Sequence, residues 1–289
     1  MSINKIKINC DVLIPARNEE STIGETLQCL NKQTIKPNSI IVVNDNSNDR
    51  TKEIAISYGA KVIDFPYEHK NWVISGKLGI VFSFGMKHFD KNNSHFMILG
   101  ADHILPENYI EDVIENMKKD NVDMASGIIE NEITKSPRGS GRIFTKKAMK
   151  CIDWKYQSNY GYETYALFKI QSEDMKTFVY PIMTKTQRPT GTHYNKKKFY
   201  HMGFSYKALG YTSFYGIGRG LIIAKKYGLY NGLMFSMGFF SNRNITYNDK
   251  IRQYCKKNLE HSWKDIMQNP KQLLRKITND DSSKKTDSN

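Results

Sequence analysis

Short apolar runs separated by segments of helical spacing constrain the fold of this 289-residue chain more than any other feature. The runs cover residues 6–15, 39–43, 60–65 and 95–99. They lack strict polar alternation, which indicates strands buried on both faces of a sheet. Apolar residues recur with helical spacing between and after them, over 21–33 (with Ser21 as N-cap), 50–58, 72–89 and 106–119. The pattern predicts an α/β fold, a parallel sheet covered by helices on both faces.

Polar residues gather directly after three of these strands, at 15–19 (PARNE), 44–47 (NDNS) and 100–103 (GADH). In open α/β sheets, ligands bind at the carboxyl ends of the strands, so we expect a site built from these three segments. The first strand is not followed by GxGxxG, which argues against a dinucleotide-dependent dehydrogenase.

Three carboxylates are candidates for the chemistry. Asp45 can accept a bond from a nucleotide base or simply stabilise a turn. Asp102 is placed either to hold Mg²⁺ or Mn²⁺ together with substrate phosphates or to cap a helix. Glu163 lies in NYGYETY, among aromatic residues that would exclude water around a general base, although an exposed glutamate in a first helical turn is the simpler alternative.

The order of these motifs resembles the inverting family 2 glycosyltransferases, which have the GT-A fold. PARNEE, NDNSNDRT and GADHIL are similar to the family's (V/I)PxxNEE, DDxSxDxT and DxD patterns, over about residues 9–190. The resemblance implies a hexosyltransferase-like enzyme in which Asp102 holds the metal and Glu163 is catalytic. It also implies a set of residues that bind the donor nucleotide: Pro15, Ala16, Arg17, Glu19, Asp45 (which reads the base), Gly76, Lys77, Ala101, Asp102 and Arg188.

Two positions depart from the family pattern. Gly100 stands where DxD has its first Asp, so metal binding is expected to rest on Asp102, with His103 as a neighbour. Thr164 follows Glu163 where the family has a second acid.

The C-terminal third carries the excess of positive charge. The formal net charge is +14, and residues 185–276 contain 18 Lys and Arg but 3 Asp and Glu. Arg188 can reach a phosphate there or lie in a solvated loop. From Phe204 onward the chain is predicted to be helical, with Gly216, Gly218 and Gly220 in helix–helix contacts. Interleaved aromatic and basic residues fit a membrane interface, single-stranded nucleic acid or a packed helical hairpin, and we favour peripheral contact with anionic membrane.

The expected organisation has three parts: a GT-A domain over 1–200, a basic, aromatic-rich helical extension over 201–277 that contacts membrane, and a disordered tail over 278–289. The four cysteines are far apart and form no CxxC, which favours a reducing compartment. The longest uncharged apolar stretch, 227–242, is shorter than a spanning helix requires. We therefore expect a cytoplasmic protein at the inner face of the cell membrane.

The predicted function is transfer of a sugar, with inversion, from a nucleotide-sugar donor to a lipid-linked or glycan acceptor, assisted by Mn²⁺ or Mg²⁺. No nucleic-acid partner is expected. Two alternatives remain open from the sequence: a nucleotidyltransferase on a similar sheet, which would release pyrophosphate, and a non-enzymatic nucleic-acid-binding protein.

Overall fold

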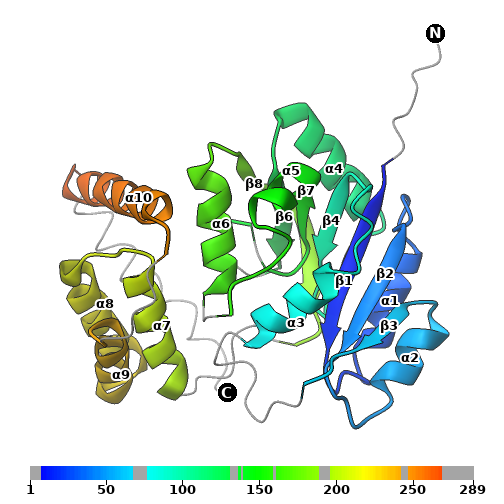
Figure 1. The fold of residues 1–289 in the computed structure, drawn as a ribbon, viewed down its shortest axis with the longest axis horizontal. Helices are drawn as coiled ribbons and strands as arrows, with labels where there is room; N and C mark the ends of the chain where they lie inside the picture. The colour runs from blue at the N-terminus through cyan, green and yellow to red at the C-terminus, as the bar shows by residue number, and fades with distance from the viewer. Residues whose placement is uncertain are drawn as a thin grey trace, which may run out of the picture. The chain divides into compact units, whose positions relative to one another are not determined.

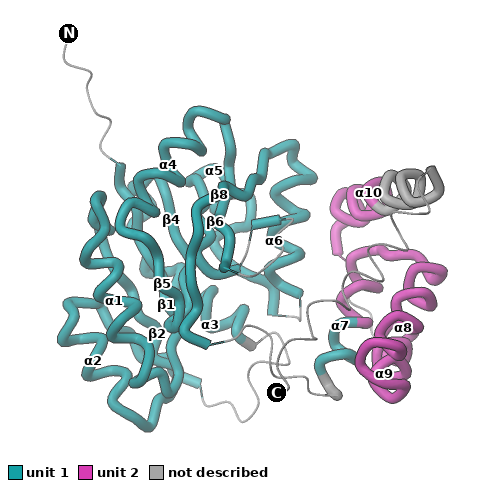
Figure 2. Tube along the Cα trace, turned by 180° about the vertical axis from the view of Figure 1, so that it is seen from behind, with its two compact units in different colours: residues 1–202 teal, residues 203–289 magenta. Residues whose placement is uncertain are grey.

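The computed structural model describes residues 8–67, 77–130, 136–137, 139–158, 161–188, 196–241 and 247–268. The chain divides into two compact units, residues 1–202 (unit 1) and 203–289 (unit 2), as Figure 2 shows by colour. Gly76 and the predicted tail over 278–289 lie outside the described residues.

Unit 1 contains a mixed eight-stranded sheet in the order β3-β2-β1-β4-β7-β6-β8-β5. Its strands are β1 (Cys10–Ala16), β2 (Ser39–Asn44), β3 (Lys61–Asp64), β4 (His95–Ile98), β5 (His103–Ile104), β6 (Met124–Ile129), β7 (Arg142–Thr145) and β8 (Thr177–Thr186). Strands β1 to β4 are parallel, as predicted. The other half departs from the prediction, because β7 runs antiparallel to both β4 and β6, and β5 runs antiparallel to β8. A parallel neighbour needs a crossover, usually a helix, and the described residues between β6 and β7 contain none.

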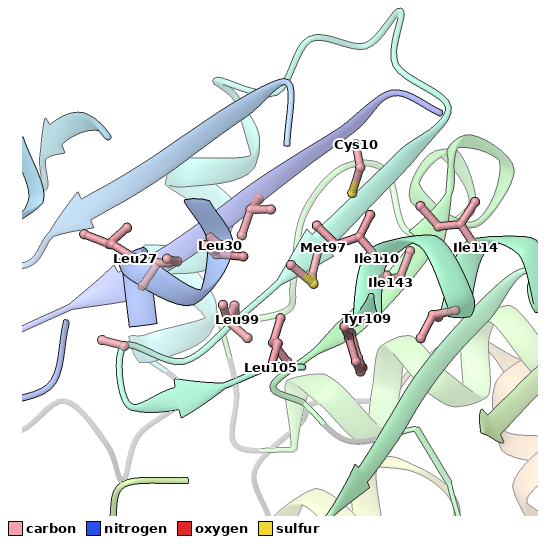
Figure 3. Packing of buried hydrophobic residues seen from close by; sticks show 14 of the residues in the cluster. Cys10, Leu27, Leu30, Met97, Leu99, Leu105, Tyr109, Ile110, Ile114 and Ile143 are labelled. Carbon is pink, nitrogen blue, oxygen red and sulfur yellow. The ribbon is translucent and has the colours of Figure 1, made fainter. Parts of the chain in front are cut away.

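Helices cover both faces of the sheet (Figure 1). The helices α1 (Ile23–Asn31), α2 (Thr51–Ser57) and α4 (Tyr109–Asp120) contribute to one buried cluster, and α3 (Lys77–Met86), α5 (Lys146–Cys151) and α6 (Tyr162–Ser172) contribute to a second. Val12 and Ile14 of β1 point into the first cluster and Leu13 into the second. Figure 3 shows the first cluster, in which Leu27 and Leu30 of α1 and Ile110 of α4 pack on the sheet. This two-sided burial explains the absence of polar positions in the strands and confirms the predicted fold class.

The start of α1 differs from the prediction. Thr22, and not Ser21, is the N-cap residue. Its hydroxyl donates a hydrogen bond of 2.7 Å to Oε2 of Glu19 instead of capping the helix. The helix therefore begins one residue later, and its first turn is tied to the PARNEE segment.

Beyond α7 (Lys196–Ala208), unit 2 contains α8 (Ser213–Tyr227), α9 (Leu229–Phe239) and α10 (Asp249–Gln268). Gly228 alone connects α8 to α9 and has a φ of +95°, a conformation that glycine adopts without strain. Gly216 and Gly220 lie in the contact between these helices, as predicted, whereas a Cβ on Gly218 would meet nothing within 4 Å. The prediction of a packing role is wrong for Gly218.

None of the helices in the described ranges combines the length and apolar character needed to cross a membrane.

Candidate active site

The loops that follow β1 and β2 are held together by hydrogen bonds at the carboxyl edge of the sheet. The backbone N–H groups of Asn18 and Glu19 donate to the hydroxyls of Ser47 and Thr51, at 3.1 and 2.7 Å. In return, the N–H of Asn48 donates to Oδ1 of Asn18 at 2.8 Å. Asn18 has a φ of +54°, in the left-handed region that asparagine tolerates better than most residues. The two predicted nucleotide motifs thus form one cross-linked surface.

Asp45 lies at the base of this surface and is completely buried. Its N–H donates to the carbonyl of Ala16 at 2.9 Å, and its Oδ1 accepts a bond of 3.3 Å from Asn46. Within the described part of the chain, Oδ2 accepts no hydrogen bond, and Nη1 of Arg17 lies 3.9 Å away. A buried carboxylate oxygen without a hydrogen bond is costly, which suits it to a donor group on a ligand.

Arg188 connects the first and third predicted motifs. Its Nε lies 3.1 Å from Oδ2 of Asp102, and its Nη2 lies 2.8 Å from Oε1 of Glu19. Burial lowers the pKa of Arg188, but the two carboxylates outweigh this effect and raise it. The neighbouring Gln187 donates its N–H to the carbonyl of Asp102 at 2.8 Å and its side-chain amide to the carbonyl of Thr22 at 3.0 Å. The end of β8 therefore fixes Arg188 beside residues far away in sequence.

A pocket of about 230 Å³ opens beside this ion-paired group. Its lining residues come from the first and third motifs, from the end of β4, from α3 and from two later segments: Pro15, Glu19, Leu78, Phe82, Ile98, Gly100, Ala101, Asp102, Gly139, Ser140 and Glu163. Glu19, Asp102 and Glu163 thus share one cavity within unit 1.

Glu163 reaches the pocket from the first turn of α6. Gly139 packs directly against its carboxylate, since a Cβ at position 139 would overlap the carboxylate oxygens. Phe82 also lines the pocket, its ring lies 6.1 Å from that of Tyr162, and the ring of Tyr162 lies 5.1 Å from that of Tyr156. Phe82 therefore lines the same pocket as this carboxylate, and any side chain at position 139 would require the carboxylate to move.

Ser140, which sequence reasoning missed, organises the third motif. Its hydroxyl accepts a bond of 2.8 Å from the N–H of Gly100 and lies 2.6 Å from Nδ1 of His103. Burial lowers the pKa of His103 to about 4, so the ring is neutral at pH 7. A Cβ at Gly100 would lie 3.1 Å from Oδ1 of Asp102, so glycine at this departure from DxD leaves room for that carboxylate. Ser140 is 37 residues from His103, and no motif spacing indicated it.

The remaining predicted residues are placed as follows. Ala16 ends β1 and is buried, and Lys77 begins α3. Within the ranges that the structure describes, no group of three or more His, Cys, Asp or Glu side chains is arranged to hold a metal ion.

A model of the family described as "Glycosyl transferase family 2" matches residues 11–199. The match covers more than half of the chain and includes every segment that lines the pocket. The chain belongs to glycosyl transferase family 2, which confirms the predicted family and the predicted class of enzyme.

Curated relatives match only a short part of this chain. A 4,4'-diaponeurosporenoate glycosyltransferase of Staphylococcus aureus (strain USA300) is 49% identical over 53 residues, which are 18% of this chain and 14% of the relative. The protein of the same name from Staphylococcus haemolyticus (strain JCSC1435) is 44% identical over 66 residues, 23% of this chain and 17% of that relative. The chain thus matches about a sixth or less of the length of these proteins.

Solved structures share the fold at low sequence identity. TarS 1-349 of S. aureus, in complex with UDP-GlcNAc, has a TM-score of 0.55 and 14% identity, covering 82% of this chain and 74% of that one. Glucosyl-3-phosphoglycerate synthase from Mycobacterium tuberculosis, in complex with Mn²⁺, UDP and its product, has a TM-score of 0.54 and 13% identity, covering 68% and 78%. The likeness extends the family assignment to the three-dimensional fold.

Proposed function

We propose that this protein transfers a sugar, with inversion, from a nucleoside diphosphate-sugar to an acceptor hydroxyl. The observation that carries the proposal is the common pocket of Glu19, Asp102 and Glu163 beside the cross-linked loops of β1 and β2. The polar groups of the site have two proposed roles. Those around Asp45, Asp102 and Arg188 are suited to hold a nucleotide and its diphosphate, and Glu163 is suited to accept a proton.

Asp45 is the proposed base-reading residue. Its Oδ2 is buried and accepts no hydrogen bond from the described residues, so a base N–H would remove an energetic cost. The TarS structure contains UDP-GlcNAc, and the mycobacterial synthase structure contains UDP. Uracil presents such an N–H, and a uridine nucleotide is therefore the first donor to test.

A divalent metal fits this site when the diphosphate is present. Mg²⁺ and Mn²⁺ prefer oxygen ligands, and Mg²⁺ is commonly held by one or two carboxylates together with substrate phosphates. Asp102 and Glu19 supply two carboxylates in one pocket, and Asp102 is the proposed ligand. When bound, the metal would neutralise charge on the departing diphosphate. The Mn²⁺ in the mycobacterial synthase structure supports this assignment.

Arg188 is the proposed second cation for the diphosphate. It now contacts two carboxylates, and its side chain is 52% exposed, so it is within reach of an incoming ligand. A preorganised cation at the place where charge develops stabilises the transition state.

Glu163 is the proposed general base. A hydroxyl becomes a competent nucleophile when a positioned base removes its proton, which typically accelerates a reaction by about 10²–10⁴-fold. This carboxylate lies against Gly139 and lines the pocket together with Phe82, so it is within reach of an acceptor bound there. The acceptor oxygen would then attack the anomeric carbon opposite the diphosphate and invert its configuration.

The proposed acceptor is lipid-linked or a glycan, and the proposed location is the inner face of the membrane, where the basic C-terminal region contacts anionic lipid. The local excess of positive charge over residues 185–276 supports membrane contact. The name of the staphylococcal relatives specifies 4,4'-diaponeurosporenoate, which is a further acceptor to test.

A thermal-shift panel of UDP-, GDP- and CDP-sugars, with and without Mn²⁺, tests the donor side, because a ligand that binds the folded state raises its stability. We expect a Mn²⁺-dependent shift with a UDP-sugar. A product assay tests the reaction: nucleoside diphosphate supports glycosyl transfer, whereas pyrophosphate would instead indicate a nucleotidyltransferase. Steeply salt-dependent nucleic-acid binding without any nucleotide-sugar binding would contradict the proposal.

A further inference from the structure

The hairpin of α8 and α9 exposes large apolar side chains. Nine such side chains are between 49% and 75% exposed: Phe214, Ile217, Leu221 and Ile222 on α8, and Leu229, Tyr230, Leu233, Met237 and Phe240 on or directly after α9. The described part of unit 1, which is much longer, has four side chains in this range. Scattered single exposures are ordinary, but an apolar surface of this density marks an interaction site.

The closest approaches of the two helices are made at glycines. A Cβ on Gly216 would lie 2.5 Å from the ring of Phe239, and one on Gly232 would lie 2.5 Å from the Cβ of Ala224. The helices therefore approach each other through glycine, in an antiparallel arrangement. Gly218, on the exposed side of α8, would meet nothing within 4 Å. The apolar face remains available after the hairpin has packed.

The two exposed stripes lie on the same side of the hairpin. The residues of α8 that contact α9, Gly216 and Ala224, define a contact line along the helix. At about 100° per residue, the exposed stripe lies roughly a quarter turn from this line and contains Phe214, Ile217 and Leu221. The stripe of Leu229 and Leu233 lies roughly a quarter turn from the contact line of α9, in the same rotational sense along the chain. Because the helices are antiparallel, equal senses bring both stripes to one side. The hairpin thus has one apolar face, which includes Phe214, Ile217, Leu221, Leu229 and Leu233, whereas Ile222 points away from it.

The charge around this face has a single sign. No Asp or Glu occurs between Asp174 and Asp249, whereas the hairpin contains Arg219, Lys225 and Lys226. Both lysines are exposed, and Lys225 follows the apolar stripe at the C-terminal end of α8. An apolar face on a hairpin whose charged residues over 213–240 are all cations, with Lys225 at the end of the stripe, is complementary to the surface of an anionic bilayer, where each basic residue contributes to binding.

The length of the helices determines the depth of contact. Helix α8 has 15 residues and α9 has 11, so at about 1.5 Å per residue both are shorter than the roughly 30 Å hydrocarbon core. The hairpin can lie along a membrane surface but cannot cross it.

We propose that the α8–α9 face inserts into the headgroup region of an anionic lipid bilayer, with Lys225 and Lys226 contacting the lipid phosphates. The inference rests on the proposed function in one respect, the lipid-linked acceptor, which gives the enzyme a reason to bind a bilayer. It differs from charge attraction alone, because apolar insertion is not screened by salt.

Flotation of the full chain with vesicles tests the proposal. The probes are phosphatidylcholine vesicles with and without phosphatidylglycerol, each at low and high salt. We expect wild-type protein to float with the anionic vesicles and to retain part of this binding at high salt. The double variant Leu221→Gln/Leu233→Gln should lower the partition coefficient at least tenfold at both salt concentrations. Lys225→Gln/Lys226→Gln should lower it mainly at low salt.

Ile56→Gln is the matched control, since Ile56 on α2 is 55% exposed, as Leu233 is. It should float like the wild type. The proposal would be overturned if the Leu221→Gln/Leu233→Gln variant floated as well as the wild type. It would also be overturned if the wild type did not float. A lipid-free dimer that this variant dissociates in sedimentation velocity would also overturn it, because a second copy would then occupy the face.

Thermal stabilisation by UDP, measured on the same samples, separates this inference from the proposed function. A variant that no longer floats but is still stabilised by UDP supports the insertion of this face. Wild-type protein that UDP stabilises but that does not float overturns the inference alone. Protein that floats as expected but is not stabilised by any nucleotide-sugar overturns the proposed function and leaves the membrane face in place.

Discussion

In unit 1 the large apolar side chains are buried on both faces of a sheet, and charged side chains converge at its edge. In unit 2 the α8–α9 hairpin buries glycines and exposes nine large apolar side chains. The difference shows that large apolar side chains can form a core in one unit and an exposed surface in the other. Unit 1 uses its apolar residues for its own core and directs polar groups toward a pocket. The hairpin packs closely at glycines, buries Ile223, Phe235 and Phe239, and exposes its other large apolar residues.

The largest expected effect concerns the chemistry of unit 1. Glu163→Gln keeps the shape of the side chain and removes its basicity, so with a hydroxyl acceptor kcat should fall by at least about a hundredfold. UDP-sugar binding should be unchanged, and it can be measured by calorimetry alongside turnover.

Glu173→Gln, just past the other end of α6, is the control and should turn over normally. Near-wild-type turnover of Glu163→Gln would refute the base assignment. It would favour an acceptor that is already anionic, such as a lipid phosphate, and would shift attention to Arg188.

Acid should destabilise unit 1 but leave the stability of the α8–α9 hairpin unchanged. Burial lowers the pKa of His95 to about 4, so between pH 6.5 and 4 the unfolded chain binds a proton that the folded chain does not. The free energy of unfolding of unit 1 therefore falls as the pH falls through this window, by about 3 kcal/mol from His95. Residues 203–248 contain no His, Asp or Glu, so the hairpin should not respond.

Urea unfolding at several pH values measures this effect. His95→Asn should flatten the dependence for the transition of unit 1, whatever its effect at pH 7. An unchanged slope in this variant would show that other groups cause the acid sensitivity.

Asp102→Ala should abolish the Mn²⁺-dependent part of donor stabilisation. At a donor concentration a hundredfold above Kd, bound ligand contributes about 2.7 kcal/mol to wild-type stability. The fold should persist, because the Asp102 side chain lies at the edge of the sheet and is 26% exposed. Thermal shifts with and without Mn²⁺ measure the effect, with Asp153→Ala, outside the pocket, as control. Intact Mn²⁺-dependent binding would remove Asp102 from the site.

The smallest effects test the packing of unit 2. Gly232→Ala would place a Cβ 2.5 Å from that of Ala224 and 2.7 Å from the carbonyl oxygen of Gly220, so it should destabilise the hairpin by about 1–3 kcal/mol. Gly218→Ala meets open space and should stabilise α8 by about 0.5–1 kcal/mol. Urea unfolding followed by circular dichroism compares them, and equal effects would contradict the glycine contact.

The sequence predicted the parallel half of the sheet well, because its strands are buried on both faces and therefore read as continuous apolar runs. The loops after β1 and β2 could also be located, since their asparagine and aspartate residues follow those runs directly. Adjacent parallel strands end at the same edge of a sheet, so these loops meet although the bonded residues are 29 and 32 positions apart. Local pattern was sufficient there.

The antiparallel half could not be predicted in the same way. Strand β5 has two residues and β7 has four, too few for a periodic signal. Ser140 and Gly139 reach the site through a loop that no motif marks. The ion pairs of Arg188 depend on the pairing of β8 with β5, which joins Thr186 to His103. Such contacts depend on tertiary folding and leave no trace in local sequence.

The strand order has a consequence for synthesis of the chain. Strands β1, β2 and β3 pair among themselves and are complete by Asp64. Strand β8 must pair with β6 and β5 before Arg188 can contact Asp102, so the site cannot close until the ribosome has passed that codon. The α8–α9 hairpin consists of local contacts, which form quickly, and it emerges later. During synthesis, the exposed apolar face of the α8–α9 hairpin therefore forms only after all the residues of the pocket have been made.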